Sequence, residues 1–262
     1  MSFDRKHQEQ SDLEKYFNQN SGRLVHKWSH YFDIYDRHFK RFRGEPVVIL
    51  EIGVFHGGSL QMWKNYFGDK VKIYGVDINP DCKALEEENV EIFIGSQSDK
   101  FFLRDLKAKI PRADIIIDDG GHTMTQQRIT FEELFDHVKE DGIYLCEDMH
   151  TSYWLEYGGG VKRRGTFIEY SKKLIDSLNA YHSRQSSFKP SSFTKSVDSL
   201  HFYDSVLVIE KKNRPKPIDL KSGVESYKSD YSQKEAPAYK RIPLSIINKV
   251  LRFLRLPGFI WK

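Results

Sequence analysis

The chain has 262 residues, a hydrophobic content of 39% and a formal net charge of +4 with 30% charged residues. This composition is enough for one domain with a sizeable core, and the small, mixed charge argues against a nucleic-acid-binding protein. Two cysteines, Cys82 and Cys146, exclude a disulfide framework and fit a reducing, cytoplasmic compartment. Residues 1–20 do not resemble a signal peptide, and no apolar run approaches the length of a transmembrane helix.

The first 45 residues predict a helical segment ahead of the core. Ser11-Asp12-Leu13-Glu14 has the pattern of a capped helix start, and residues 28–42 are aromatic and amphipathic. Such helices either pack on the edge of a sheet or form a lid over its ligand, and both interpretations stay open. We expect three parts: the helical segment or lid at 1–45, a core at 46–212, and a linker with a basic tail at 213–262.

Residues 47–52 form a short apolar run rich in β-branched side chains, which is typical of a buried parallel strand. The run breaks at Gly53, and residues 59–67 then have the periodicity of a helix. A strand, a glycine turn and a helix N-terminus allow close approach of a polar ligand. The turn is neither G-x-G-x-x-G nor a P-loop, and Glu51 at the strand end favours a positively charged ligand over a pyrophosphate.

Two more strands are predicted, over 71–77 and 90–94. Asp77 ends the first of them, where an acid is placed to bind the two ribose hydroxyls of a nucleoside. Small polar residues at 95–99 follow the second and are suited to an adenine pocket. Each signal is weak alone, but their order along the chain predicts a nucleoside site.

Acidic residues end the next two predicted strands. The strand over 113–118 runs into Asp118-Asp119 and His122, and the strand over 143–147 runs into Glu147-Asp148. The carboxyl ends of neighbouring parallel strands face one crevice, where four acids and a histidine repel one another unless a cation joins them. Such oxygen ligands suit Mg²⁺. The competing interpretation is that these acids are helix N-caps.

Two helices and a hairpin complete the predicted core. We expect a helix over 131–138, ended by Asp141 and Gly142, and an amphipathic helix over 166–178. Residues 199–210 alternate or run apolar around an Asp-Ser turn, which predicts an antiparallel hairpin.

The segments LEIGVFHGGSLQMW, YGVDINP, GSQSD and IIIDDGGHT, together with EDMHTSYW, resemble class I S-adenosylmethionine methyltransferases. Within that class the chain is similar, over about 47–212, to the metal-dependent sugar O-methyltransferases: the mycinamicin and macrocin enzymes and their bacterial polysaccharide relatives. The resemblance implies a Rossmann-like α/β fold. Its seven-stranded sheet is mostly parallel, ends in a C-terminal antiparallel hairpin, and carries helices on both faces.

The resemblance also implies a role for each motif residue. Around the methionine part of S-adenosylmethionine it places Glu51, Gly53, Gly58 and Ser59. It puts the ribose on Asp77 and the adenine near Gln97, and we add Asp118 to these cofactor-binding residues. The implied Mg²⁺ ligands are Asp119, Glu147 and Asp148. It also makes His122 the general base. We count the metal ligand Asp119, three residues before it, as a second catalytic residue.

The predicted reaction is Mg²⁺-dependent methyl transfer from S-adenosylmethionine to a hydroxyl of a glycan or glycosylated metabolite. A metal favours the alkoxide form of a bound hydroxyl, and His122 can take the proton at neutral pH. One alternative is a metal-dependent catechol-type O-methyltransferase, which usually has a lysine base, whereas none stands after Asp119 here. Another is a non-catalytic protein that binds S-adenosylmethionine or a glycan.

The C-terminal residues differ in character from the core. Residues 213–239 are polar and contain three prolines, which indicates a linker. In residues 239–262 the apolar positions Leu244, Ile247, Leu251 and Leu254 recur at helical spacing among basic residues, with Trp261 near the end. Such a segment suits an anionic membrane surface, which fits a lipid-linked glycan acceptor at the inner membrane face. The alternative is that it docks on the protein's own core or on a second subunit of a homo-oligomer.

Overall fold

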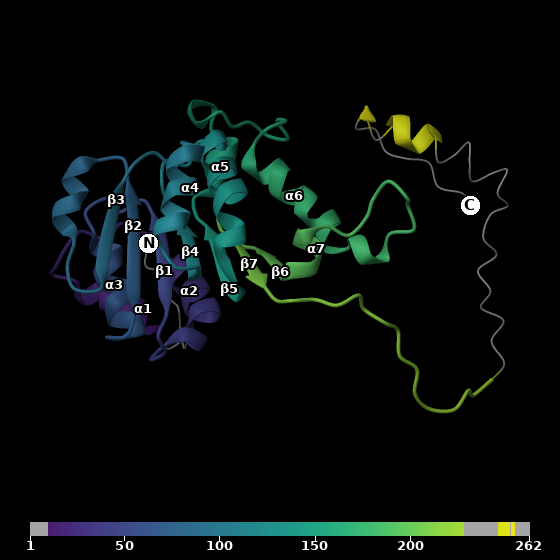
Figure 1. The fold of residues 1–262 in the computed structure, drawn as a ribbon, viewed down its shortest axis with the longest axis horizontal. Helices are drawn as coiled ribbons and strands as arrows, with labels where there is room; N and C mark the ends of the chain where they lie inside the picture. The colour runs from purple at the N-terminus through teal and green to yellow at the C-terminus, as the bar shows by residue number, and fades with distance from the viewer. Residues whose placement is uncertain (1–9, 228–245, 252, 255–262) are drawn as a thin grey trace, which may run out of the picture. The chain divides into compact units, whose positions relative to one another are not determined.

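The computed structural model describes residues 10–227, 246–251, 253 and 254. The chain divides into two compact units, one ending at Pro217 and one beginning at Ile218 (Figure 1). The first unit contains the sheet and the helices named below. Among the described residues, no helix has both the length and the apolar character needed to span a bilayer.

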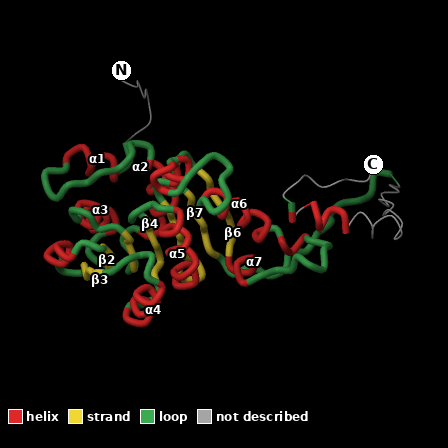
Figure 2. The backbone as a smooth tube through the Cα atoms, turned by 90° about the horizontal axis from the view of Figure 1, so that it is seen from above, coloured by secondary structure: helices red, strands yellow, loops and turns green. Residues whose placement is uncertain are grey.

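A seven-stranded sheet forms the centre of the first unit, in the order β3-β2-β1-β4-β5-β7-β6 (Figures 1 and 2). Five strands are parallel: β1 (Val48–Ile52), β2 (Lys72–Asp77), β3 (Val90–Ile94), β4 (Ala113–Asp118) and β5 (Val138–Cys146). The antiparallel hairpin of β6 (Val197–Phe202) and β7 (Leu207–Lys211) joins them through pairing of β7 with β5. The predicted fold class and the closing hairpin are confirmed.

Helices cover both faces of the sheet, as Figure 2 shows. Their bounds are α1 (Asp12–Gln19), α2 (Tyr31–Phe39), α3 (Gly58–Phe67), α4 (Lys100–Lys109), α5 (Met124–Leu134), α6 (Phe167–Leu178) and α7 (Ser192–Ser196). Ile115 and Ile117 of β4 pack in one core cluster with α1, α2 and α3, whereas Ile116 packs in the other with α4, α5 and α6. Successive side chains of a strand point to opposite faces, so a strand covered on both sides has a nearly continuous apolar run, as at residues 115–117.

The N-terminal segment follows the sequence prediction only in part. The Ser11 side chain accepts a hydrogen bond of 3.2 Å from the Glu14 backbone amide, so the predicted capped start is confirmed. Residues 28–42, by contrast, are not one helix: α2 begins at Tyr31 and a short 3-10 turn over Lys40–Phe42 follows it. Buried aromatic side chains of α2 pack on the sheet, which accounts for the amphipathic pattern.

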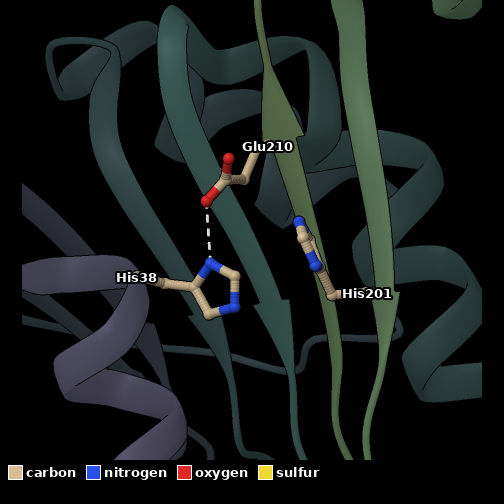
Figure 3. Close-up of side chains that lie close together, drawn as sticks. All are labelled: His38, His201 and Glu210. Carbon is tan, nitrogen blue, oxygen red and sulfur yellow. Dashed lines mark hydrogen bonds and ion pairs between the residues drawn. The ribbon is translucent and has the colours of Figure 1, made fainter.

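A histidine links α2 to the C-terminal hairpin. The His38 ring contacts Glu210 Oε1 at 2.7 Å through Nδ1 and the Tyr203 hydroxyl at 2.8 Å through Nε2. The centroid of the His201 ring lies 4.7 Å from that of His38. Figure 3 shows the two rings with Glu210. Because both nitrogens of His38 already have polar partners, this group is a structural connection between the first and last parts of the unit.

The predicted helix over 131–138 with an end at Asp141 and Gly142 is wrong. The helix is α5, which ends at Leu134, and β5 starts at Val138 and passes through Gly142. A Cβ at Gly142 would lie 2.5 Å from the Asp114 carbonyl oxygen, so the glycine permits close approach of β5 to β4. A glycine after a helix and a glycine within a strand look alike in sequence.

The segments for which we predict a linker and a basic tail lie largely outside the described residues. Residues 213–227 contain no helix or strand, and residues 246–251 are helical. The linker and the basic tail stay predictions. Ile246, Ile247 and Val250 of that helix are exposed. Leu244 and Trp261 of the predicted stripe lie outside the described residues.

Candidate functional site

A cavity of about 650 Å³ opens at the carboxyl ends of the parallel strands, within the range of small-molecule sites. Residues that follow β1, β2, β3 and β4 line it, together with residues 24–27 of the N-terminal segment. The predicted site residues that line the cavity are Gly53, Ser59, Asp77, Gln97, Asp119, His122 and Asp148. Four other predicted residues are buried nearby without lining it: Glu51, Gly58, Asp118 and Glu147.

The glycines of the first turn permit two close approaches. Gly53 has a φ of 96°, and a Cβ there would lie 2.0 Å from the Asp119 carbonyl oxygen. A Cβ at Gly58 would lie 2.2 Å from the carbonyl oxygen of Leu24. Gly53 therefore brings the β1 loop against the β4 loop, while Gly58 brings the start of α3 against the segment that lines the cavity.

Asp77 at the end of β2 holds the glycine turn in place. Its Oδ2 accepts hydrogen bonds of 2.9 Å from the amides of Val54 and Phe55, and its Oδ1 accepts one of 2.8 Å from Asn79. An ionised carboxylate has about four acceptor positions, so Asp77 keeps capacity for a ligand hydroxyl. Its position in the cavity lining suits the predicted contact with a ribose.

Gln97 and Asp118 brace the loop that carries Asp119. The Gln97 amide oxygen accepts a 2.6 Å hydrogen bond from the Gly121 amide, and its nitrogen donates one of 3.0 Å to Asp118. Burial raises the pKa of Asp118 to about 7, whereas the hydrogen bonds that Tyr144 and Gln97 donate to its carboxylate act to lower this pKa. Asp118 thus lies behind the cavity wall, and the polar atoms of Gln97 are engaged within the protein.

Glu51 is a buried carboxylate without a hydrogen bond. Both of its oxygens and the indole nitrogen of Trp63 lack a partner among the described residues. Burial raises the pKa of Glu51 to about 7, while the charge of Lys27 and the nearby polar groups of Trp63 and Ser59 act in the opposite direction. A buried acceptor left open in this way fits the positively charged end of S-adenosylmethionine.

The structure adds a residue that the sequence did not indicate, Lys27. Its Nζ lies 2.5 Å from Asp119 Oδ2 and 3.0 and 2.8 Å from the two carboxylate oxygens of Glu147. Burial acts to lower the pKa of Lys27, but the carboxylates of Asp119, Glu147 and Glu51 outweigh burial and raise it. Lys27 is separated from these acids by 92 and 120 residues and belongs to no motif, so local sequence carries no signal for it.

Both carboxylate oxygens of the buried Glu147 accept hydrogen bonds from the N-terminal segment. The Tyr35 hydroxyl donates a 2.7 Å hydrogen bond to Oε1, in addition to the contacts of Lys27. Burial and the neighbouring Asp119 raise the pKa of Glu147, and Lys27 and Tyr35 oppose this effect. Glu147 therefore depends on the ammonium group for its charge balance.

His122 and Asp148 face each other across the β4 and β5 loops. Both have left-handed backbone conformations, with φ of 57° and 52°, of the kind that concentrates at functional sites. His122 Nε2 lies 3.3 Å from Asp148 Oδ2, and the Tyr31 hydroxyl donates a 2.7 Å hydrogen bond to Asp148 Oδ1. The Nδ1 atom of His122 has no hydrogen-bond partner among the described residues.

The donor atoms at this site suit a hard divalent cation. Ligand atoms of Asp119, His122 and Asp148 all lie within 4.8 Å of one another. Two of these residues belong to the predicted set, whereas the third predicted ligand, Glu147, is paired with Lys27. Carboxylate oxygens are the preferred ligands of Mg²⁺, so the acids present fit this ion. Asp119 belongs both to this group and to the pair of acids that contact Lys27.

The chain is similar to known proteins of one family. The family described as "Methyltransferase domain" matches residues 50–149. Demethylmacrocin O-methyltransferase of Streptomyces fradiae is 38% identical over 202 residues, which cover 72% of this chain and 51% of that protein. Mycinamicin VI 2''-O-methyltransferase of Micromonospora griseorubida is 36% identical over 188 residues, covering 68% and 47%.

A solved structure is similar as well. The MycE methyltransferase from the mycinamycin biosynthetic pathway, in complex with Mg, SAH and mycinamycin VI, has a TM-score of 0.68 at 33% identity. The match covers 79% of this chain and 54% of that one. The chain spans about half the length of the curated relatives that it matches.

Proposed function

Since this chain contains a class I methyltransferase domain and is a homologue of the macrolide-sugar O-methyltransferases, we propose that it methylates a sugar hydroxyl. The donor is S-adenosylmethionine, and the acceptor is a glycan or a glycosylated metabolite. One observation carries the proposal. One cavity is lined both by Gly53 and Asp77, which are predicted to bind the nucleoside, and by the group of Asp119, His122 and Asp148.

Glu51, Gly53 and Asp77 account for donor binding. The unpartnered carboxylate of Glu51 would offer an acceptor for the cationic end of the donor, and Asp77, which lines the cavity, would bind its ribose. Gly53 lets the loop after β1 lie against the Asp119 backbone, where a Cβ would clash. In this arrangement the protein chiefly positions the methyl group against the acceptor oxygen.

The acids and His122 account for activation of the acceptor. Asp119, Glu147 and Asp148 would hold Mg²⁺, which when bound stabilises the negative charge that develops on an acceptor oxygen. His122 presents Nε2 to the acids, 3.3 Å from Asp148 Oδ2, whereas its Nδ1 is buried. In the neutral imidazole with its proton on Nδ1, Nε2 is the basic nitrogen. His122 then takes the proton of the acceptor hydroxyl as the general base.

A catechol-type enzyme with a lysine base is the second candidate, because the fold brings Lys27 to Asp119 although no lysine follows Asp119 in sequence. The surrounding carboxylates raise the pKa of Lys27, so its amine stays protonated at neutral pH and is a poor base. His122 is the better candidate on this ground.

The test is turnover of the full chain with a panel of glycosides, in Mg²⁺ and in EDTA. Methyl transfer that EDTA abolishes and Mg²⁺ restores, while calorimetry shows that S-adenosylhomocysteine still binds in EDTA, is the expected result. Full activity in EDTA would refute the metal assignment, and transfer to catechols with none to sugars would favour the second candidate. Donor binding without transfer to any acceptor would indicate a non-catalytic binding protein.

A further inference from the structure

The ammonium group of Lys27 lies between two proposed metal ligands, Asp119 and Glu147. Its side chain is only 3% exposed, and its ammonium group contacts three carboxylate oxygens of Asp119 and Glu147. A lysine has three donors and a fixed positive charge. These three contacts use all of its donors, so the ammonium fully occupies the position of a cation between the two acids.

We propose that Lys27 is an internal cation that fills the metal site of the metal-free protein, and that a divalent ion binds by displacing it. The inference rests on the metal assignment of the proposed function, but neither on the acceptor nor on methyl transfer. It makes Lys27 a positioning residue, because it acts on the metal ligands rather than on a substrate.

Charge and distance explain why the two cations compete. A Mg²⁺ ion binds carboxylate oxygens at about 2.1 Å, whereas Lys27 Nζ already lies 2.8 Å from Glu147 Oε2 and 2.5 Å from Asp119 Oδ2. An ion on these oxygens would therefore stand close to the ammonium group, where like charges repel strongly in a poorly solvated site. Tyr35, which also donates to Glu147 Oε1, is neutral and does not oppose the ion.

The rest of the acid group is ready to receive an ion once Lys27 leaves. Asp119 contacts Lys27 through Oδ2, while its ligand atom also falls within the group formed with His122 and Asp148. Lys27 belongs to residues 24–27, which line the cavity where the donor is proposed to bind. Displacement of its side chain thus couples the metal site to one wall of the donor site.

The decisive experiment measures Mn²⁺ binding to the metal-free full chain by electron paramagnetic resonance of the free ion. Lys27→Met keeps a side chain of similar length and removes the competing charge, so we expect at least tenfold tighter binding. Lys64→Met is the matched control, since Lys64 pairs with Glu87 away from this site and should leave affinity unchanged. We also expect Lys27→Met to melt at a lower temperature than the native protein in EDTA and to gain more from Mg²⁺. Mn²⁺ affinity equal to or weaker than that of the native protein would overturn the inference.

A second measurement needs no variant. In EDTA the buried Lys27 amine should resist acetylation by an amine-reactive reagent, and saturating Mg²⁺ should make it reactive, as mass spectrometry of its peptide would show. Unchanged protection with the metal bound would overturn the displacement. Absence of Mn²⁺ binding in every variant would overturn both this inference and the proposed metal. Tight Mn²⁺ binding in Lys27→Met without methyl transfer by the native protein would refute only the proposed reaction.

Discussion

Replacing Glu51 by Gln tests whether this buried carboxylate serves a ligand rather than the fold. The side chain is fully buried, and its oxygens have no hydrogen-bond partner among the described residues. Burial raises its pKa from 4.5 to about 7. Above that pH the folded protein holds a negative charge that its surroundings disfavour, and glutamine has nearly the same shape without the charge.

The magnitude follows from the pKa. One pKa unit corresponds to about 1.4 kcal/mol, so a rise from 4.5 to about 7 amounts to roughly 3 kcal/mol of folding free energy. Because the folded pKa is the higher one, the protonated group stabilises the folded state fully below pH 4.5, and this contribution is lost as the pH rises through 7. The glutamine amide is itself unpaired there, which offsets part of the gain. We expect Glu51→Gln to be about 1–3 kcal/mol more stable than the native protein at pH 8, with the difference disappearing near pH 4.5.

Urea unfolding at pH 5 and pH 8 measures the stability, and calorimetry with S-adenosylhomocysteine measures the affinity. The affinity of Glu51→Gln should fall at least tenfold, since a charged acceptor for the ligand's ammonium group is gone. Glu45→Gln is the control, because Glu45 is exposed on the surface and should change neither quantity. Lower stability at pH 8 would show that the carboxylate supports the fold. Unchanged affinity would place the ligand's cationic end elsewhere.

Three further predictions concern other residues. Asp77→Ala removes charge-assisted hydrogen bonds worth about 1.5–3 kcal/mol each, so calorimetry should show at least tenfold weaker donor binding, and native affinity would move the ribose elsewhere. His122→Ala should lose about 10²–10⁴-fold in rate and keep its donor affinity. His182→Ala, at an exposed position, is the control and should keep the native rate. A normal rate in His122→Ala would show that His122 is not the general base. Burial lowers the pKa of His38 below 6.5, so its contribution to stability is present above pH 6.5 and is lost as the pH falls. Unfolding curves of His38→Gln should accordingly show a smaller loss of stability between pH 7 and 5, and an unchanged loss would assign the effect to another group.

The sequence predicted the sheet and the acids because their signals are local. Runs such as Ile115-Ile116-Ile117 are buried on both faces, and the topology of parallel strands brings Asp119 and Asp148 to one edge. Lys27 and Tyr35 could not be predicted, since they reach Glu147 over 120 and 112 residues and their own neighbourhood resembles an ordinary amphipathic segment. The sequence therefore does not predict contacts between residues that are far apart along the chain.

The hydroxyl of Tyr31 connects parts of the chain that are made at very different times. It donates to Asp148, and its oxygen lies 2.9 Å from the Ser205 hydroxyl; these partners lie 117 and 174 residues further on. During synthesis on the ribosome the aromatic helix α2 is made well before Asp148, and Ser205 follows only with the turn between β6 and β7. Closing so long a loop is entropically costly and slow. Tyr31 therefore lacks its Ser205 partner until the β6–β7 hairpin has been made, and chains truncated before that hairpin are expected to be substrates for cellular quality control.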